Sequence, residues 1–159
     1  MIRSATPADV PVILGLVRDL AEYERGLHEV RATQEQLRDV LFGERPAAFC
    51  DIAEVEGEVA GFALWFLNFS TWLGCHGIYL EDLYVRPDRR RDGIGRALLV
   101  HLARRCVERG YGRLEWSVLD WNEPALGFYR SIGAVPMDEW TVHRLTGDAL
   151  AELARSGAR

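Results

Sequence analysis

Hydrophobic residues recur every three or four positions along several stretches of the chain, which is the spacing of one face of an α-helix. The first stretch follows Thr6, and Asp9 stands three residues later, as in a capping box. Pro7 between them suits a first helical turn. The stretches predict helices from Pro7 to Tyr23, from the cap Thr33 to near Gly43, from Ile94 to Gly110, from Asn122 to Gly133 and from about Asp148.

Apolar runs between these helices are typical of strands. They predict strands at residues 2–4, 49–55, 58–69, 78–85 and 111–119, and strand-like residues at Val135 and at 141–145. Glu56 and Gly57, between two of the runs, predict a hairpin turn, and residues 156–159 predict a frayed end. The order of the elements predicts an α/β fold with a mixed sheet wrapped by helices, and the length predicts a single domain over residues 1–159.

The charge and hydropathy of the chain exclude several classes of function. A formal net charge of −5 lacks the basic field that nucleic-acid binding requires. All 19 cationic residues are arginines, which excludes a lysine Schiff base and a Walker A phosphate loop. No apolar run approaches the roughly 18 residues of a membrane span, and the first residues do not read as a targeting leader. We therefore expect a cytoplasmic enzyme or binding module.

The cysteines and histidines do not have the spacing of a metal site. Both sets are scattered along the chain: Cys50, Cys75, Cys106, His28, His76, His101 and His143. The cysteines are interpreted as small hydrophobic residues of the core, and no metal is expected.

The segment with the clearest chemical pattern joins the apolar run 78–85 to the helix that begins at Ile94. It reads V-R-P-D-R-R-R-D-G-I-G and ends in Gly93-x-Gly95, two positions where the backbone is free to approach a ligand. Amides at a helix N-terminus favour an anion such as a pyrophosphate, and flanking arginines add charge-assisted contacts. A simple tight turn remains an alternative. A Rossmann site fits less well, because it needs three glycines after the first strand.

With the residues that follow, this segment resembles the acyl-CoA-binding motif of the GNAT acetyltransferases, in which V-x-P precedes R/Q-x-x-G-x-G/A. The later stretch W-N-E-P-A-L-G-F-Y-R-S-I-G-A resembles the second signature of that family. One position departs from the pattern, since Arg91 stands where the family usually has Gly. The stretches A-E-Y-E-R and Y-L-E-D-L-Y-V are similar to the spermidine/spermine and thialysine acetyltransferase branch, whose likeness covers nearly the whole chain except residues 136–139.

The resemblance implies a GNAT fold, with a mostly antiparallel sheet that splays at the cofactor site. It also implies acetyl-CoA as co-substrate, a small amine as substrate and a homodimer. The residues that it implies for cofactor binding are Leu83, Tyr84, Val85, Arg90, Arg91, Asp92, Gly93, Ile94, Gly95, Arg96, Asn122, Pro124, Ala125 and Tyr129. Asn122 is equally well explained as a helix cap.

Acetyl transfer to an amine needs a proton acceptor for the amine and a proton donor for the leaving thiolate. By resemblance, Tyr129 is the general acid, and Glu81 binds the amine and relays its proton through water. Glu81 and Asp82 are adjacent in a predicted strand, so they point to opposite faces unless a bulge intervenes. A structural salt bridge remains the alternative for both carboxylates.

Further substrate contacts are expected at Tyr23 and Glu24, which match the pair facing the polyamine in this branch, and at Asp82 and Asp138. An exposed helix end explains the pair equally well. Two other functions stay open at this point. One is acetylation of a different amine, such as an amino acid, an aminoglycoside or a protein N-terminus. The other is a non-catalytic domain that binds acyl-CoA.

Overall fold

A computed structural model describes residues 1–157 of the chain. The contacts within it divide the chain into two compact units, Met1–Leu119 and Asp120–Arg159.

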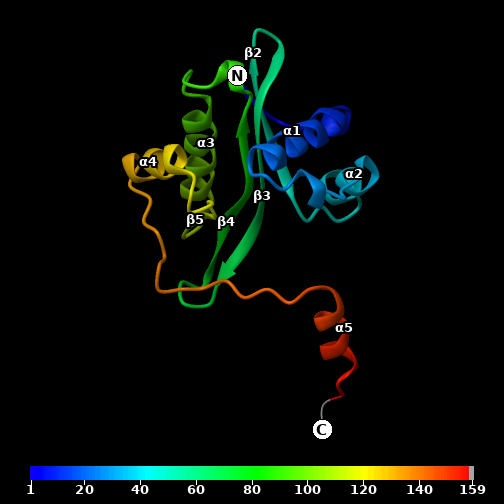
Figure 1. Cartoon of the computed structure of the whole chain (residues 1–159). Helices are drawn as coiled ribbons and strands as arrows, with labels where there is room; N and C mark the ends of the chain where they lie inside the picture. The colour runs from blue at the N-terminus through cyan, green and yellow to red at the C-terminus, as the bar shows by residue number, and fades with distance from the viewer. Residues whose placement is uncertain (158–159) are drawn as a thin grey trace. The chain divides into compact units, whose positions relative to one another are not determined.

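The first unit is built on a five-stranded sheet with the strands in sequence order. The strands are β1 (Ile2–Ser4), β2 (Phe49–Val55), β3 (Glu58–Ser70), β4 (Cys75–Val85) and β5 (Leu114–Trp116). Neighbours from β1 to β4 are antiparallel, and β5 runs parallel to β4 (Figure 1). The predicted mixed, mostly antiparallel sheet is therefore confirmed. The hairpin turn is also confirmed, since Glu56 and Gly57 both have positive φ, 54° and 83°.

Helices cover both faces of this sheet (Figure 1). One face carries α1 (Val10–Tyr23) and α2 (Gln34–Phe42), and the other carries α3 (Ile94–Arg109). The predicted cap of α2 is present, because the Gln36 amide donates to the Thr33 hydroxyl at 3.2 Å. The α-helix predicted from Pro7 begins at Val10 instead, after a 3₁₀ turn over Pro7–Asp9. Pro11 has no amide hydrogen to donate back to the Pro7 carbonyl, so the first turn closes through the amide of Val10.

The hydrophobic core on the α1 and α2 side of the sheet fixes where the ends of β4 and α1 lie. Phe62 on β3 and Ile13 on α1 are completely buried there. Tyr84, near the end of β4, belongs to the same cluster and is 7 % exposed. The two elements are also in direct contact, since α1 packs against β4.

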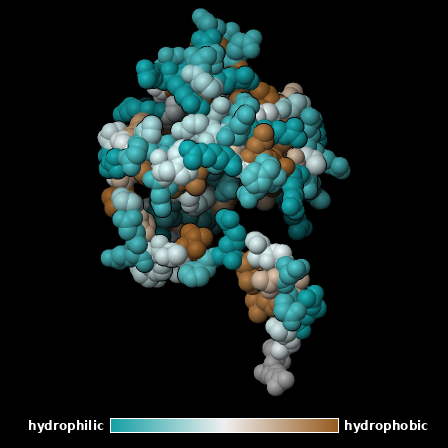
Figure 2. All heavy atoms as spheres, viewed as in Figure 1, coloured by the Kyte–Doolittle hydropathy of each residue, from teal (hydrophilic) through white to brown (hydrophobic). Residues whose placement is uncertain are grey.

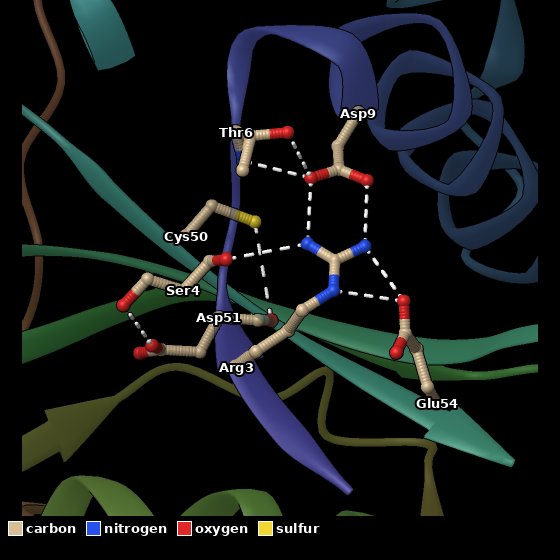
Figure 3. A network of polar contacts seen from close by, with 7 residues as sticks. All are labelled: Arg3, Ser4, Thr6, Asp9, Cys50, Asp51 and Glu54. Carbon is tan, nitrogen blue, oxygen red and sulfur yellow. Dashed lines mark hydrogen bonds and ion pairs between the residues drawn. The ribbon is translucent and has the colours of Figure 1, made fainter. Parts of the chain in front are cut away.

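An ion-pair network fastens β1 to the start of α1 and to β2 (Figure 3). The Arg3 guanidinium donates to both carboxylate oxygens of Asp9, at 2.7 and 2.9 Å, and to Glu54 at 2.8 Å. Asp9 also accepts the amide and the hydroxyl of Thr6. The hydrogen bonds from Arg3 lower the pKa of Asp9 from 3.8 to about 2, although burial opposes them.

We expect Asp9→Asn to lower the free energy of unfolding at pH 7 by about 1–2 kcal/mol, because Asn keeps the cap but loses the ion pair. The folded-state pKa is depressed, so the ionised carboxylate stabilises the fold above about pH 4. That stabilisation is lost as the pH falls through about 2. Urea unfolding at pH 7 and pH 3 measures both effects.

The matched control is Glu56→Gln, which removes an exposed partner of Arg89 at 3.4 Å. We expect this control to change the free energy of unfolding by less than about 0.5 kcal/mol. Equal effects of the two substitutions would show that the Arg3 network adds nothing beyond surface charge.

The second unit contains α4 (Glu123–Ser131) and α5 (Gly147–Arg155), both at the predicted places. The strand-like interpretation of Val135 and of residues 141–145 was wrong. In the described part of the chain these residues pair with no strand, and Val135 and Val142 are 76 % and 83 % exposed. The apolar side chains of α5 gather along one side of the helix (Figure 2). Of the predicted frayed end, residues 158–159 lie outside the described residues.

The strand predicted over residues 111–119 is also shorter in the structure, where β5 covers Leu114–Trp116. Its neighbour β4 pairs with it only from Ile78 to Leu80, and beyond Leu80 β4 pairs with β3 but not with β5. Cys50 and Cys106 are buried as expected, and Cys75 is half-buried. Among residues 1–157, no helix is long and apolar enough to cross a membrane.

Candidate active site

A β-bulge lies at Glu81, in the middle of β4. Leu64 of β3 pairs with Asp82, but the next residue, Trp65, pairs with Leu80, so Glu81 is the extra residue on its strand. The bulge interrupts the alternation that sends adjacent side chains to opposite faces. Because of this bulge, the side chains of Glu81 and Asp82 are able to line the same pocket.

Three carboxylates, Glu24, Glu81 and Asp82, lie close enough together for their charges to interact. Burial, then the charges of Glu81 and Glu24, raises the pKa of Asp82 from 3.8 to about 6. Partial desolvation, then the charge of Glu81, raises the pKa of Glu24. Glu24 follows the last residue of α1, so the helix end and the bulge bring residues 57 positions apart in sequence into one acidic cluster. Such a cluster favours a cation, and a carboxyl with a pKa near 6 is suited to accepting a proton near neutral pH.

The edge of β4 beyond the bulge is open on the side of β5. Pairing with β5 stops at Leu80, whereas the amide of Arg86 still donates to Ala60 on the β3 side. Hydrogen-bonded and non-hydrogen-bonded pairs alternate in an antiparallel ladder. The backbone groups of Leu83 and Val85 therefore face away from β3, toward the open edge. This is the local splay that the resemblance implied, and an extended chain can add there like a strand.

The loop between β4 and α3 combines a helix N-terminus with unusual backbone geometry. Gly93 caps α3 with φ of 76°, in the left-handed region. Gly95 lies where an added Cβ would contact Val85 at 3.8 Å, so the helix start packs closely on the strand end. Ile94 is buried, whereas Asp92 and the first-turn residue Arg96 are exposed. The first amides of α3 have no intrahelical acceptors, and they present a site for an anion.

Arg91 has φ of 77°, so it adopts the conformation that its usual counterpart, glycine, adopts without strain. We expect Arg91→Gly to have a free energy of unfolding about 1 kcal/mol higher than Arg91→Ala, because both lose the charge but only glycine relieves the left-handed backbone. Urea unfolding of the two variants side by side measures the difference. Equal stabilities would mean that the loop carries no strain at this residue.

The Arg90 side chain is exposed, but it makes contacts within the protein. Its Nε donates to the Val85 carbonyl at 3.1 Å. Its guanidinium carbon lies 5.1 Å from the centre of the Tyr23 ring and 5.4 Å from that of Tyr84. Both distances are within the range of a cation–π contact. The sequence pattern suggested phosphate binding for this side chain, and no feature of the sequence indicated its contacts with the two rings.

The remaining site residues from the sequence belong to the second unit. The Asn122 carboxamide accepts a hydrogen bond from the Ala125 amide at 3.4 Å, which is the N-cap geometry, and Pro124 lies in the first turn of α4. Tyr129 is half-buried on the same helix, with its ring centre 5.6 Å from that of Phe128. Asp138 is exposed and lies outside regular structure.

A buried polar cluster on the α3 side of the sheet was not predicted. Asp51 of β2 is 1 % exposed and accepts the Trp65 indole at 2.8 Å. His101 and Arg105 of α3 each lie 3.5 Å from its other oxygen. The cluster ties α3 to β2 and β3. In the part of the chain that the structure covers, no group of three or more His, Cys, Asp or Glu side chains is arranged to hold a metal ion.

A mixed sheet that opens beside a glycine-capped helix defines the class of the protein, an acetyltransferase fold. The Acetyltransferase (GNAT) family model matches residues 14–134, and the chain belongs to this family. It is 40 % identical to the thialysine N-epsilon-acetyltransferase of Bos taurus, over 97 % of this chain and 96 % of that protein. It is 34 % identical to the L-ornithine N5-acetyltransferase of Arabidopsis thaliana, over 94 % of this chain and 85 % of that protein.

The comparison of folds agrees with the comparison of sequences. An integron cassette protein from the mobile metagenome of V. cholerae superposes with a TM-score of 0.81 at 29 % identity, and 98 % of each chain is covered. The protein is thus an N-acetyltransferase, and its relatives include enzymes that act on amines.

Proposed function

We propose that this enzyme transfers the acetyl group of acetyl-CoA to a small amine, such as a polyamine or a thialysine-like compound, by direct attack of the amine on the thioester. The observation that carries the proposal is the acidic cluster of Glu24, Glu81 and Asp82 beside the open edge of β4. A cationic amine is attracted to the cluster and is delivered next to the place where an acyl donor can add to the sheet.

The acyl donor is bound by the backbone rather than by large side chains. The groups of Leu83 and Val85 that face the open edge pair with the amides of the pantetheine arm. The amides from Arg91 to Gly95 and the positive end of α3 bind the pyrophosphate, with Arg96 close by. Asn122 and its neighbours on α4 contact the arm, as the resemblance implies.

Proton transfer is divided between two kinds of group. Glu81 holds the ammonium and relays its proton through water, and Asp82 accepts it, since a pKa near 6 leaves this carboxylate ionised but still basic at neutral pH. Tyr129 donates a proton to the departing thiolate. Tyr23 and Asp138 complete the contacts to the substrate.

The names of the relatives support a substrate with a primary amine on a flexible arm. Thialysine and ornithine are both amino acids with such a side chain. Spermidine has the same terminal amine without the carboxylate, so it separates an amino-acid substrate from a polyamine.

The test is the release of free CoA from acetyl-CoA with a panel of amines, comprising thialysine, ornithine, lysine, spermidine, putrescine, an aminoglycoside and a peptide with a free N-terminus. We expect turnover with one or two of the small amines. Turnover with only the aminoglycoside, or with only the peptide, would show that the substrate belongs to a different class of amine. Acetyl-CoA binding without turnover of any amine would favour a non-catalytic acyl-CoA-binding protein.

We also propose that the enzyme works in the cytoplasm and that, as the resemblance implies, it forms a homodimer. Apolar side chains on α5 support a self-association surface, since Leu150 and Leu153 are 52 % and 62 % exposed. Light scattering on the purified protein distinguishes a dimer from a monomer.

A further inference from the structure

Arg90 connects the loop proposed to bind the acyl donor with the helix end proposed to bind the amine. The loop that carries it, between β4 and α3, faces the acyl donor, whereas Tyr23 immediately precedes Glu24 of the acidic cluster. We propose that Arg90 is a positioning residue that couples the acyl-donor loop to the amine-facing end of α1, through its contacts with Val85, Tyr84 and Tyr23. The inference rests on the proposed function of the loop.

The three contacts orient the guanidinium from different directions. The hydrogen bond to the Val85 carbonyl ties the side chain to the end of β4. Tyr84 is 7 % exposed and fixed in the core, so it gives the guanidinium a rigid surface. Tyr23 is 38 % exposed at the last residue of α1, and its position there depends more on its contacts. Contact with the fixed Tyr84 ring therefore restricts the motion of the Arg90 side chain. Arg90 in turn restricts Tyr23 at the end of α1.

Binding of a pyrophosphate to the loop immobilises Arg91–Gly93, and with them the adjacent backbone of Arg90. A guanidinium held in one orientation restricts Tyr23 and the neighbouring Glu24. The amine then binds to a helix end that is already ordered, and it loses less conformational entropy on binding. By linkage, a change at Tyr23 must affect the affinity for the acyl donor. A direct phosphate ligand at Arg90 predicts no such dependence on Tyr23.

The first experiment uses CoA alone as the probe, so it does not depend on knowing the amine. The dissociation constant of CoA is measured by calorimetry for the wild type, Tyr23→Leu, Tyr23→Phe, Arg90→Gln and the double variant Tyr23→Leu/Arg90→Gln. We expect Tyr23→Leu to weaken CoA binding about threefold to fivefold, the size of an exposed cation–π contact. Tyr23→Phe keeps the ring and is expected to bind as the wild type does.

The double variant tests the coupling itself. We expect Tyr23→Leu to have no further effect once Arg90 is Gln, because the connection is already broken. Additive losses, or no effect of Tyr23→Leu on CoA binding, would overturn the inference and leave Arg90 as a phosphate ligand. A wild type that does not bind CoA would instead refute the proposed function, and the inference with it.

Hydrogen exchange gives a second measurement, and its result would not change if Arg90 had only a structural role. The amides of Glu24, Arg25 and Gly26 bond to carbonyls of the last turn of α1. We expect CoA to slow their exchange several-fold in the wild type and in Tyr23→Phe, but not in Arg90→Gln saturated with CoA. Protection that persists in saturated Arg90→Gln would show that the signal does not pass through this side chain.

Discussion

Tyr129→Phe is expected to lower kcat by about 10²–10³-fold, because it removes the proposed proton donor to the departing thiolate. The ring and its packing against Phe128 remain, so the free energy of unfolding is expected to stay within about 0.5 kcal/mol of the wild-type value. Steady-state release of CoA measures kcat, and calorimetry measures the affinity for acetyl-CoA, which we expect to remain unchanged.

The matched control is Tyr111→Phe, which removes a hydroxyl from a half-buried tyrosine that the mechanism does not use. Its kcat is expected to equal that of the wild type. An unchanged kcat in Tyr129→Phe would remove Tyr129 from the mechanism. A lower affinity for acetyl-CoA with the same kcat would make it a binding residue only.

Asp82→Asn is expected to lower kcat/KM by about 10²-fold at pH 7.5, because the variant has no carboxylate to accept the proton. In the wild type, the acidic limb of the pH profile is expected near pH 6, where Asp82 ionises. Activity rises with pH through this value because the ionised form is the active one. A limb that persists near pH 6 in Asp82→Asn would assign it to another group.

The same substitution is expected to stabilise the fold while it lowers activity. The folded-state pKa of Asp82 is raised above 3.8, so its charge penalises the folded state, and wild-type stability falls as the pH rises from about 4 to about 6. Asp82→Asn removes this penalty and is expected to raise the free energy of unfolding at pH 7 by about 1–2 kcal/mol. A loss of stability would point to a structural role instead.

Glu81→Gln distinguishes the role of Glu81 from that of Asp82. The charge of Glu81 helps to raise the pKa of Asp82, so its removal is expected to move the acidic limb to lower pH. The amine is also held less tightly, which raises KM. A limb that stays in place would show that the charge of Glu81 does not affect the pKa of Asp82.

Local rules in the sequence predicted the helix caps and the hairpin turn, and a glycine pattern marked the loop proposed to bind the acyl donor. The reciprocal cap of Thr33 and Gln36 needs only four consecutive residues, and so does the turn at Glu56 and Gly57. The glycine pattern of the family marks Arg91 as a departure, and its left-handed backbone is the conformation that glycine favours. In each case the physical cause lies within a few residues of its effect.

The sequence alone predicted less well where a residue depends on a distant partner. Residues 141–145 have a strand-like composition, but they form no strand because nothing within residues 1–157 pairs with them as a neighbouring strand. The bulge at Glu81 arises from the register with β3, which a single strand does not reveal. The site of Arg90 is set by Tyr23 and Tyr84, two rings from separate elements.

The sequence by itself therefore determined the family, because the family follows from short motifs. The same motifs supplied the loop proposed to bind the acyl donor and the proposed site residues. Only the tertiary structure decided that Glu24, Glu81 and Asp82 form one cluster. It also decided that the pKa of Asp82 lies near 6. The reason is physical, since burial and the charges of neighbouring groups act through space and depend on which segments the fold brings together.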